Sequence, residues 1–209
     1  MKNPIIASVT LVLCLAAATN TEAAGNAETG KALYAICVAC HGVNGEGNTL
    51  LNSPVIGGQE EWYVTRELQY FKTGIRGTDS LDVFGAQMRP MAMTLTSEQA
   101  IADVAAYVTS LKPPVPPTTI KGDVAAGKAG FALCVACHGA KGEGNIAFNA
   151  PRLTGQYDWY MARQLANFKA GIRGSKPEDT FGMQMRPMAM TLIDEAAINN
   201  MAAFISTLK

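Results

Sequence analysis

Hydrophobic residues recur at helical spacing in three stretches of the first half of the chain, and loops rich in Gly and Pro separate them. The pattern predicts helices over Ala27–Val38, Glu61–Thr73 and Ser97–Leu111. Asn26 is a candidate N-cap for the first helix, and Gly74 ends the second. Three or four short helices with long loops bury a small core. The pattern therefore favours an all-α fold built around a large cofactor.

The second half of the chain repeats the first at an offset of 97 residues without a gap. Positions 30–112 and 127–209 share 47 identical residues among 83, which indicates a tandem duplication of one complete domain. Four prolines within residues 113–117 exclude a helix and favour a stiff, extended linker. We therefore expect an N-terminal domain at 24–112, a linker at 113–120 and a C-terminal domain at 121–209.

The N-terminus is typical of a secretory signal peptide. Lys2 precedes an apolar run from Ile5 to Ala18, and small residues follow it up to Ala24. This run is shorter than the roughly 20 apolar residues of a membrane span, so we expect residues 1–23 to be removed and the mature protein to be periplasmic. Lipid attachment at Cys14 and an uncleaved anchor are the alternatives. The sequence leaves open whether the mature protein is soluble or peripheral at the membrane surface.

Two C-x-x-C-H motifs stand at equivalent positions of the repeat. In a secreted protein this motif attaches c-type haem, because two thiols one helical turn apart bond to the porphyrin vinyl groups and the next His binds the iron. Disulfides, a redox-active dithiol or half of a zinc site are the alternatives. A zinc site would need further Cys or His ligands, and a dithiol leaves both histidines unexplained. We predict two covalent haem c groups, held by Cys37, Cys40, His41, Cys134, Cys137 and His138.

The other axial ligand of each iron must be a different residue type, because every mature Cys and His is already assigned. Met is the natural candidate. Each copy carries the segment MRPMAMTL, which we expect to form a loop before the last helix. Core packing is the commoner role of a Met-rich segment, but the recurrence in both copies favours a ligand. We prefer Met88 and Met185, with Met91, Met188 and the later Met93 as alternatives.

The whole pattern resembles the class I cytochromes c and, in its tandem form, the dihaem carriers of the cytochrome c4 family. The resemblance covers nearly the whole mature chain and implies an all-α fold of two tandem class I cytochrome c domains. The family places its Met ligand at the first Met of such a segment. The resemblance also implies that the carbonyl groups of Pro54 and Pro151 accept the Nδ1 hydrogen of each His. It further implies a close crossing of the first and last helices at Gly30 and Gly127, next to Tyr34, Tyr107, Phe131 and Phe204.

Polar and aromatic residues that follow each Pro are candidates for contacts to the haem propionates. The family carries a Gly-Gln pair and an aromatic residue here, and an Arg can pair with a carboxylate in bidentate fashion. The alternative for the arginines is that they are solvated surface charges. The candidates are Gln59, Trp62, Tyr63 and Arg76 in the first copy and Gln156, Trp159, Tyr160 and Arg173 in the second.

Charge distinguishes the two copies. The whole chain has 17 basic and 17 acidic residues, a balance that argues against a nucleic-acid partner. Residues 24–112 carry six basic and nine acidic residues, whereas residues 121–209 carry ten and seven. Because such charge steers encounters and selects docking faces, we expect the two domains to meet different redox partners.

The motifs predict an electron carrier rather than an enzyme, with no small-molecule substrate. Iron bound by His and Met has no open position, and the sequence contains no catalytic triad or phosphate loop. The resemblance implies that electrons pass from a quinol-oxidising cytochrome bc complex or a dehydrogenase to a terminal oxidase. The alternative is a haem subunit of a flavocytochrome-type sulfide dehydrogenase or another dehydrogenase. A dihaem enzyme would need a vacant or unusual ligand position, for which no Cys or His remains.

Overall fold

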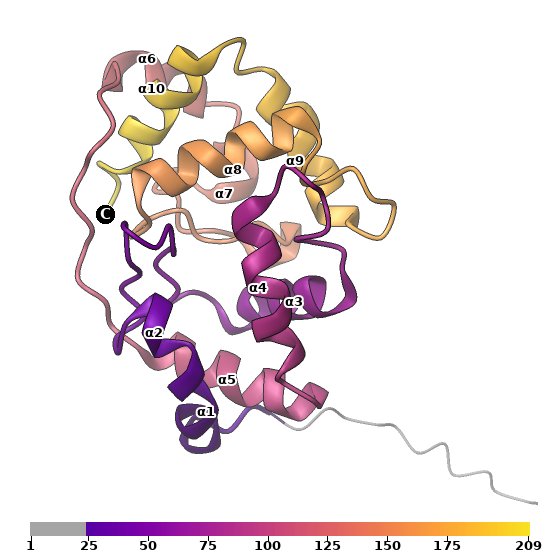
Figure 1. Cartoon of the computed structure of the whole chain (residues 1–209). Helices are drawn as coiled ribbons and strands as arrows, with labels where there is room; N and C mark the ends of the chain where they lie inside the picture. The colour runs from indigo at the N-terminus through magenta and orange to yellow at the C-terminus, as the bar shows by residue number, and fades with distance from the viewer. Residues whose placement is uncertain (1–23) are drawn as a thin grey trace, which may run out of the picture.

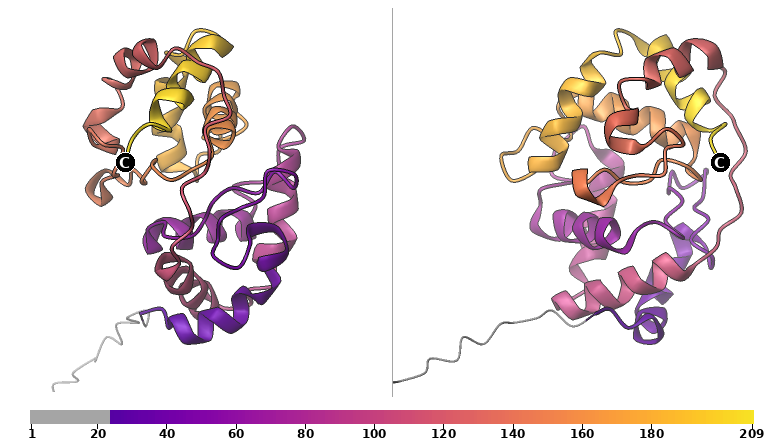
Figure 2. Two further views of the ribbon diagram at one scale, coloured as in Figure 1. Left: turned by 90° about the vertical axis from the view of Figure 1, so that its left-hand side faces the viewer. Right: turned by 180° about the vertical axis from the view of Figure 1, so that it is seen from behind.

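The computed structural model describes residues 24–209, so the predicted signal peptide and Cys14 lie outside the described residues. Within this range the chain is helical and has no strand, only two isolated β-bridges. Two helical bodies lie side by side, joined by an extended segment along one edge (Figures 1 and 2). The elements are α1 (Ala27–Leu33), η1 (Tyr34–Ile36), α2 (Val38–His41), α3 (Glu61–Thr73), α4 (Val83–Met93), α5 (Glu98–Ser110), α6 (Val124–Phe131), α7 (Val135–His138), η2 (Ile146–Phe148), α8 (Asp158–Ala170), α9 (Thr180–Met190) and α10 (Glu195–Ile205).

The helix ends follow the local signals of the sequence closely. The side chain of Asn26 accepts hydrogen bonds from two backbone amides of α1, and that of Ser97 accepts one from the Ala100 amide of α5. Gly74 ends α3 in the left-handed region, with a φ of 81°. The helix predicted over Ala27–Val38 is wrong in its extent, because it tightens into the 3-10 turn η1 and restarts as α2. The prediction of an all-α fold is confirmed.

The expectation that the MRPMAMTL segments form loops is wrong. The first lies largely in helix α4 and the second in α9, with Pro90 and Pro187 inside the helices. A proline inside a helix removes one backbone hydrogen bond, and its ring clashes with the carbonyl four residues earlier. Against that loss, Asp82 caps α4 by accepting a hydrogen bond from the Gly85 amide, and Ala92 is buried near the other end.

The first and last helices of each half cross at a glycine, as the resemblance implies. A Cβ built on Gly30 would lie 1.9 Å from the carbonyl oxygen of Asp103 in α5, so no larger residue fits. The rings of Tyr34 and Tyr107 pack beside this crossing with centroids 5.3 Å apart. The equivalent crossing of α6 and α10 occurs at Gly127, beside the rings of Phe131 and Phe204. This contact closes the core of each half.

The segment between the halves is held against the second half. Residues 111–123 contain no helix. The buried carboxylate of Asp158, at the start of α8, accepts hydrogen bonds from the amide of Ile120 and the hydroxyl of Thr119, both at 2.7 Å. The linker thus has a fixed path. None of the helices described in residues 24–209 is long and apolar enough to cross a membrane.

Candidate cofactor site

Each C-x-x-C-H motif forms a short helical turn, and its two cysteines and its histidine line one cavity. Cys37 precedes α2 and Cys134 precedes α7, and all four cysteines of the described chain are free thiols. Burial raises the pKa of the Cys37 thiol to about 11, and it also raises that of Cys134. A redox-active dithiol needs a lowered thiol pKa. The raised pKa values of Cys37 and Cys134 therefore argue against a reactive dithiol.

Each histidine of the motifs is buried and fixed by a proline carbonyl. The Nδ1 atom of His41 lies 3.0 Å from the carbonyl oxygen of Pro54, and that of His138 lies 2.8 Å from the carbonyl oxygen of Pro151. With the hydrogen on Nδ1, the lone pair is on Nε2. Burial lowers the pKa of both imidazoles and so favours this neutral form. These are the contacts that the resemblance implies.

The Nε2 atom of His138 is buried and has no hydrogen-bond partner among the described residues. A buried polar atom without a partner is costly, so native proteins nearly always satisfy it. A metal ion would do so here, because the fixed tautomer leaves Nε2 as a donor of electrons. This atom, the free thiols and an apolar surrounding fit a covalent haem.

A cavity of about 370 Å³ extends through both halves of the molecule. It is lined by the four cysteines and two histidines of the motifs, and by Pro54 and Pro151. Gln59, Tyr63 and Arg76 also line it, as do the equivalent residues Gln156, Tyr160 and Arg173. Trp62 and Trp159 do not line it. Met88 and Met91 line the cavity in the first half, as do Met185 and Met188 in the second, whereas Met93 is 56% exposed and Met190 60%. The geometry thus narrows the predicted axial ligands to two methionines in each half.

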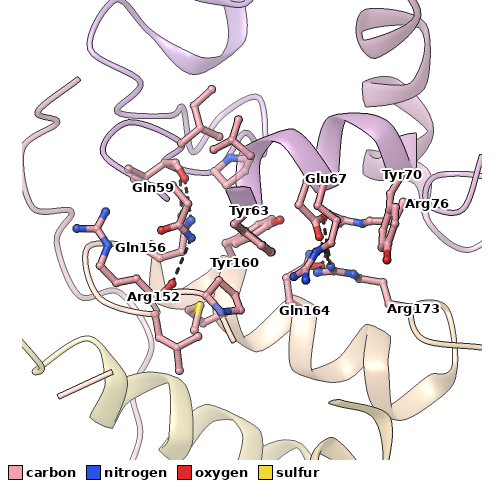
Figure 3. Close-up of a pocket in the computed structure, with 18 of the residues that line it drawn as sticks. Gln59, Tyr63, Glu67, Tyr70, Arg76, Arg152, Gln156, Tyr160, Gln164 and Arg173 are labelled. Carbon is pink, nitrogen blue, oxygen red and sulfur yellow. Dashed lines mark hydrogen bonds and ion pairs between the residues drawn. The ribbon is translucent and has the colours of Figure 1, made fainter. Parts of the chain in front are cut away.

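The glutamines that follow the prolines make contacts across the interface between the halves (Figure 3). The side-chain amide of Gln59 donates to the carbonyl oxygen of Arg152 at 3.2 Å, and that of Gln156 donates to the carbonyl oxygen of Val55 at 2.8 Å. Val55 and Arg152 are themselves equivalent under the 97-residue offset. The interface therefore has the self-complementary form of a two-fold dimer contact.

Arg76 and Arg173 meet at the centre of this interface (Figure 3). Both are buried, so the interpretation of these arginines as solvated surface charges is wrong. Arg76 forms an ion pair with Glu67 of its own half, and Arg173 reaches the same carboxylate from the other half at 3.2 Å. Arg173 also donates to Gln164 at 2.7 Å. Burial alone would raise the pKa of Glu67, but the guanidinium groups outweigh it and hold the pKa below its usual value.

Sequence reasoning missed the residues that join the halves. Glu67, Arg66, Gln164 and Arg163 lie on α3 and α8 and contact the opposite half. One signal was available, because Arg66 and Glu67 follow Tyr63 at the spacing that places them near it on one helical face. Arg66 also recurs as Arg163 in the second copy, which was a second signal that this helical face has a role. A repeat does not, however, reveal how its copies dock.

Comparison with known proteins identifies relatives that span the whole described chain. The family model described as cytochrome c matches residues 27–112 and again 124–209. A cytochrome c4 from Azotobacter vinelandii is 37% identical over 93% of this chain and 96% of its own length. The crystal structure of reduced recombinant cytochrome c4 from Pseudomonas stutzeri superposes with a TM-score of 0.71 at 32% identity, covering 89% of this chain and all of the other.

A further relative carries a functional name. The thiosulfate dehydrogenase electron acceptor of Thiomonas intermedia is 32% identical over 68% of this chain and 67% of its own length. Its match is shorter than that of the Azotobacter protein, which spans both halves and the linker. Of these names, that of the Thiomonas protein describes an electron acceptor.

Proposed function

The chain belongs to the cytochrome c family, in the tandem dihaem form of cytochrome c4, and we propose that it is a periplasmic carrier that takes single electrons from a quinol-oxidising cytochrome bc complex or a dehydrogenase to a terminal oxidase. It carries two covalently bound haem c groups, its partners are redox proteins, and its relatives are electron carriers. Haem iron with both axial positions filled supplies one-electron transfer and no open site for a substrate.

The observation that carries this proposal is the pair of buried histidines with their Nδ1 atoms bonded to proline carbonyls. We assign His41 and His138 as the proximal ligands, presenting Nε2 to the iron. Two methionines in each half line the cavity that these histidines also line, and we assign the first of each pair, Met88 and Met185, as the distal ligands, as the resemblance to the family implies. Cys37, Cys40, Cys134 and Cys137 hold the porphyrins covalently.

The same assignment extends to the residues at the interface. Gln59, Tyr63 and Arg76, with Gln156, Tyr160 and Arg173, are proposed to contact the haem propionates, which their place in the cavity supports. Trp62 and Trp159 are left out of this set because they do not line the cavity. The mature chain would comprise the domains 24–112 and 121–209 with the linker 113–120, after removal of the signal peptide 1–23.

A second candidate donor rests on the relatives named as thiosulfate dehydrogenase electron acceptors. The thiosulfate dehydrogenase electron acceptor of Thiomonas intermedia favours a sulfur-oxidising dehydrogenase as the source of electrons. In that case the protein serves the dehydrogenase as a separate acceptor or as its haem subunit. Both versions keep the same site and the same one-electron chemistry, and they differ only in the donor.

Stopped-flow measurement on the native dihaem protein tests the proposal. We expect a quinol-loaded cytochrome bc complex to reduce both haems, and a terminal oxidase to oxidise them, at rates that depend on salt. A dehydrogenase that copurifies with the protein and reduces it faster than the bc complex would support the second candidate. Reduction by neither donor, or no oxidation by the oxidase, would contradict the carrier role.

A further inference from the structure

Two equivalent arginines cross the interface in opposite directions. Arg66 lies on α3 of the first half and Arg163 lies at the same place on α8 of the second. Each guanidinium lies over a Trp of its own helix, one turn earlier: Arg66 is 5.0 Å from the Trp62 ring centroid and Arg163 is 4.9 Å from that of Trp159. These cation–π contacts hold each side chain in place. They also give the two tryptophans a role outside the cavity.

Arg163 contacts two segments of the opposite half. Its guanidinium lies 4.1 Å from the ring centroid of Phe84, which is one helical turn before Met88 on α4. Its Nη2 atom donates to the Oδ1 atom of Asn52 at 2.5 Å. Asn52 precedes Pro54 by two residues, and the carbonyl of Pro54 fixes His41. One side chain of the second half thus touches the helix that carries Met88 and the loop whose Pro54 carbonyl fixes His41.

Arg66 makes the reciprocal pair of contacts. Its guanidinium lies 4.8 Å from the ring centroid of Phe181, one turn before Met185 on α9. Both of its terminal nitrogens lie 3.4 Å from the carbonyl oxygen of Asn149, two residues before Pro151. The pattern is therefore built twice, once in each direction across the interface.

The asparagines at these contacts have an unusual backbone. Asn52 and Asn149 have φ values of 56° and 52°, and no other non-glycine residue among the described ones has a positive φ. Asparagine adopts this conformation more readily than other side-chain-bearing residues, and Asn149 here is the C-cap of η2. The arginine of the opposite half bonds the asparagine in each turn. This asparagine lies two residues before the proline whose carbonyl fixes the histidine.

We propose that Arg66 and Arg163 are reciprocal positioning residues, each fixing the proximal loop and the distal helix of the opposite domain's haem. The inference rests on the proposed function, which assigns the histidines and methionines as axial ligands. Its consequence is directional, because the loss of one arginine changes the axial geometry of the haem in the other domain. A motion that separates the domains would break the contacts of both arginines together.

Proton NMR of the reduced dihaem protein tests this directly. A methionine bound to haem iron has its methyl signal shifted far upfield by the porphyrin ring, so each domain gives one such signal. Met88→Ala and Met185→Ala assign the two signals by removing one each. We expect Arg163→Ala to shift or broaden the signal of Met88 and to leave that of Met185 in place. Arg66→Ala should do the reverse.

Two further variants separate positioning from general loosening of the interface. Lys176→Ala removes another cation that crosses the interface, to the carbonyl of Gly74 and the hydroxyl of Thr78, and it should leave both signals unchanged. Arg163→Lys keeps the charge but loses the planar group that stacks on Phe84, so it should reproduce the directional shift in a protein that keeps its fold.

The outcomes distinguish this inference from the proposed function. Equal shifts of both signals in Arg163→Ala, a shift confined to the variant's own domain, or no shift at all would overturn the reciprocal roles. The absence of upfield methyl signals from the unchanged protein would instead overturn the methionine ligation on which they rest.

Discussion

Glu67 and Gln164 occupy equivalent positions on α3 and α8, yet only Glu67 is charged. Arg76 and Arg173, which are also equivalent, both bond the Glu67 carboxylate, and both reach the side-chain oxygen of Gln164, at 3.4 and 2.7 Å. The centre of the interface is therefore symmetric in its shape but carries two buried positive groups and one negative group. A single carboxylate holds this cluster together.

Glu67→Gln should destabilise the protein substantially. The substitution keeps the shape of the side chain but removes the protein carboxylate that pairs with two buried guanidinium groups, and breaking a buried pair in this way is expensive. We expect the free energy of unfolding to fall by about 2–4 kcal/mol, measured by guanidinium denaturation at neutral pH. The double variant Glu67→Gln/Gln164→Glu moves the carboxylate to the other side of the cluster and should recover most of the loss. A double variant as unstable as the single one would contradict a role for the charge.

The stability difference between the unchanged protein and Glu67→Gln should depend on pH. The guanidinium groups hold the pKa of Glu67 below its ordinary value despite its burial, so the ionised carboxylate stabilises the folded state. That stabilisation is complete above the unfolded-state pKa, about 4.3, and is lost as the pH falls through the lower folded-state value. The difference in unfolding free energy between the unchanged protein and Glu67→Gln should therefore be constant near neutral pH and shrink below about pH 4. A difference independent of pH would exclude the carboxylate as its source.

Met88→Ala should remove one of the two axial methionines and leave both haems covalently attached. The ferric protein has a weak charge-transfer band near the red end of the visible spectrum that reports the bond between Met sulfur and iron. We expect Met88→Ala and Met185→Ala each to remove about half of its intensity. Met91→Ala and Met188→Ala are the matched controls, because these residues line the same cavity. Loss of the band in the controls and its survival in Met88→Ala would reassign the ligand within the helix.

The sequence predicted those features of the fold that short stretches determine. Glu61–Thr73 forms a helix with the predicted bounds because its apolar spacing and the glycine at its end act locally. The helix α4 was missed because Pro90 suggested a loop, while the cap at Asp82 and the burial of Ala92 decided otherwise. The partners of Gln59 and Glu67 belong to the other half, and no pattern within one copy encodes how two copies dock.

Two glycines of α6 should respond in opposite ways to the same substitution. A Cβ at Gly127 would lie 2.0 Å from the carbonyl oxygen of Asn200 in α10, so Gly127→Ala must push the two helices apart. We expect it to lower the free energy of unfolding by about 2–3 kcal/mol. At Gly130 a Cβ would meet only the flexible end of Met201, so Gly130→Ala should raise it by about 0.5–1 kcal/mol. Thermal unfolding of both variants measures the contrast, and equal effects would refute the close crossing.

The last prediction concerns the charge difference between the domains. Residues 24–112 carry six basic and nine acidic residues, and residues 121–209 carry ten and seven. Exposed charges of this kind change association rates more than affinities, and salt screens them beyond about 8–10 Å. If the domains meet different partners, changing the charge of one domain alters the encounter with one partner only.

Two neutralised variants of the full dihaem protein test that expectation. Glu28→Gln/Glu61→Gln removes exposed acidic charge from the first domain, and Lys128→Gln/Lys141→Gln removes exposed basic charge from the second. We measure the second-order rate constant of electron transfer with the donor and with the oxidase, across ionic strength. Each variant should change the rate with a single partner, roughly two- to fivefold at low salt, and the effect should vanish at high salt because the charges are then screened. The partner affected by the lysine variant docks on the second domain, and electrons then cross the interface between the domains on their way through the protein. Equal changes with both partners would mean that one face serves donor and acceptor alike, and the charge difference would then have no part in choosing between them.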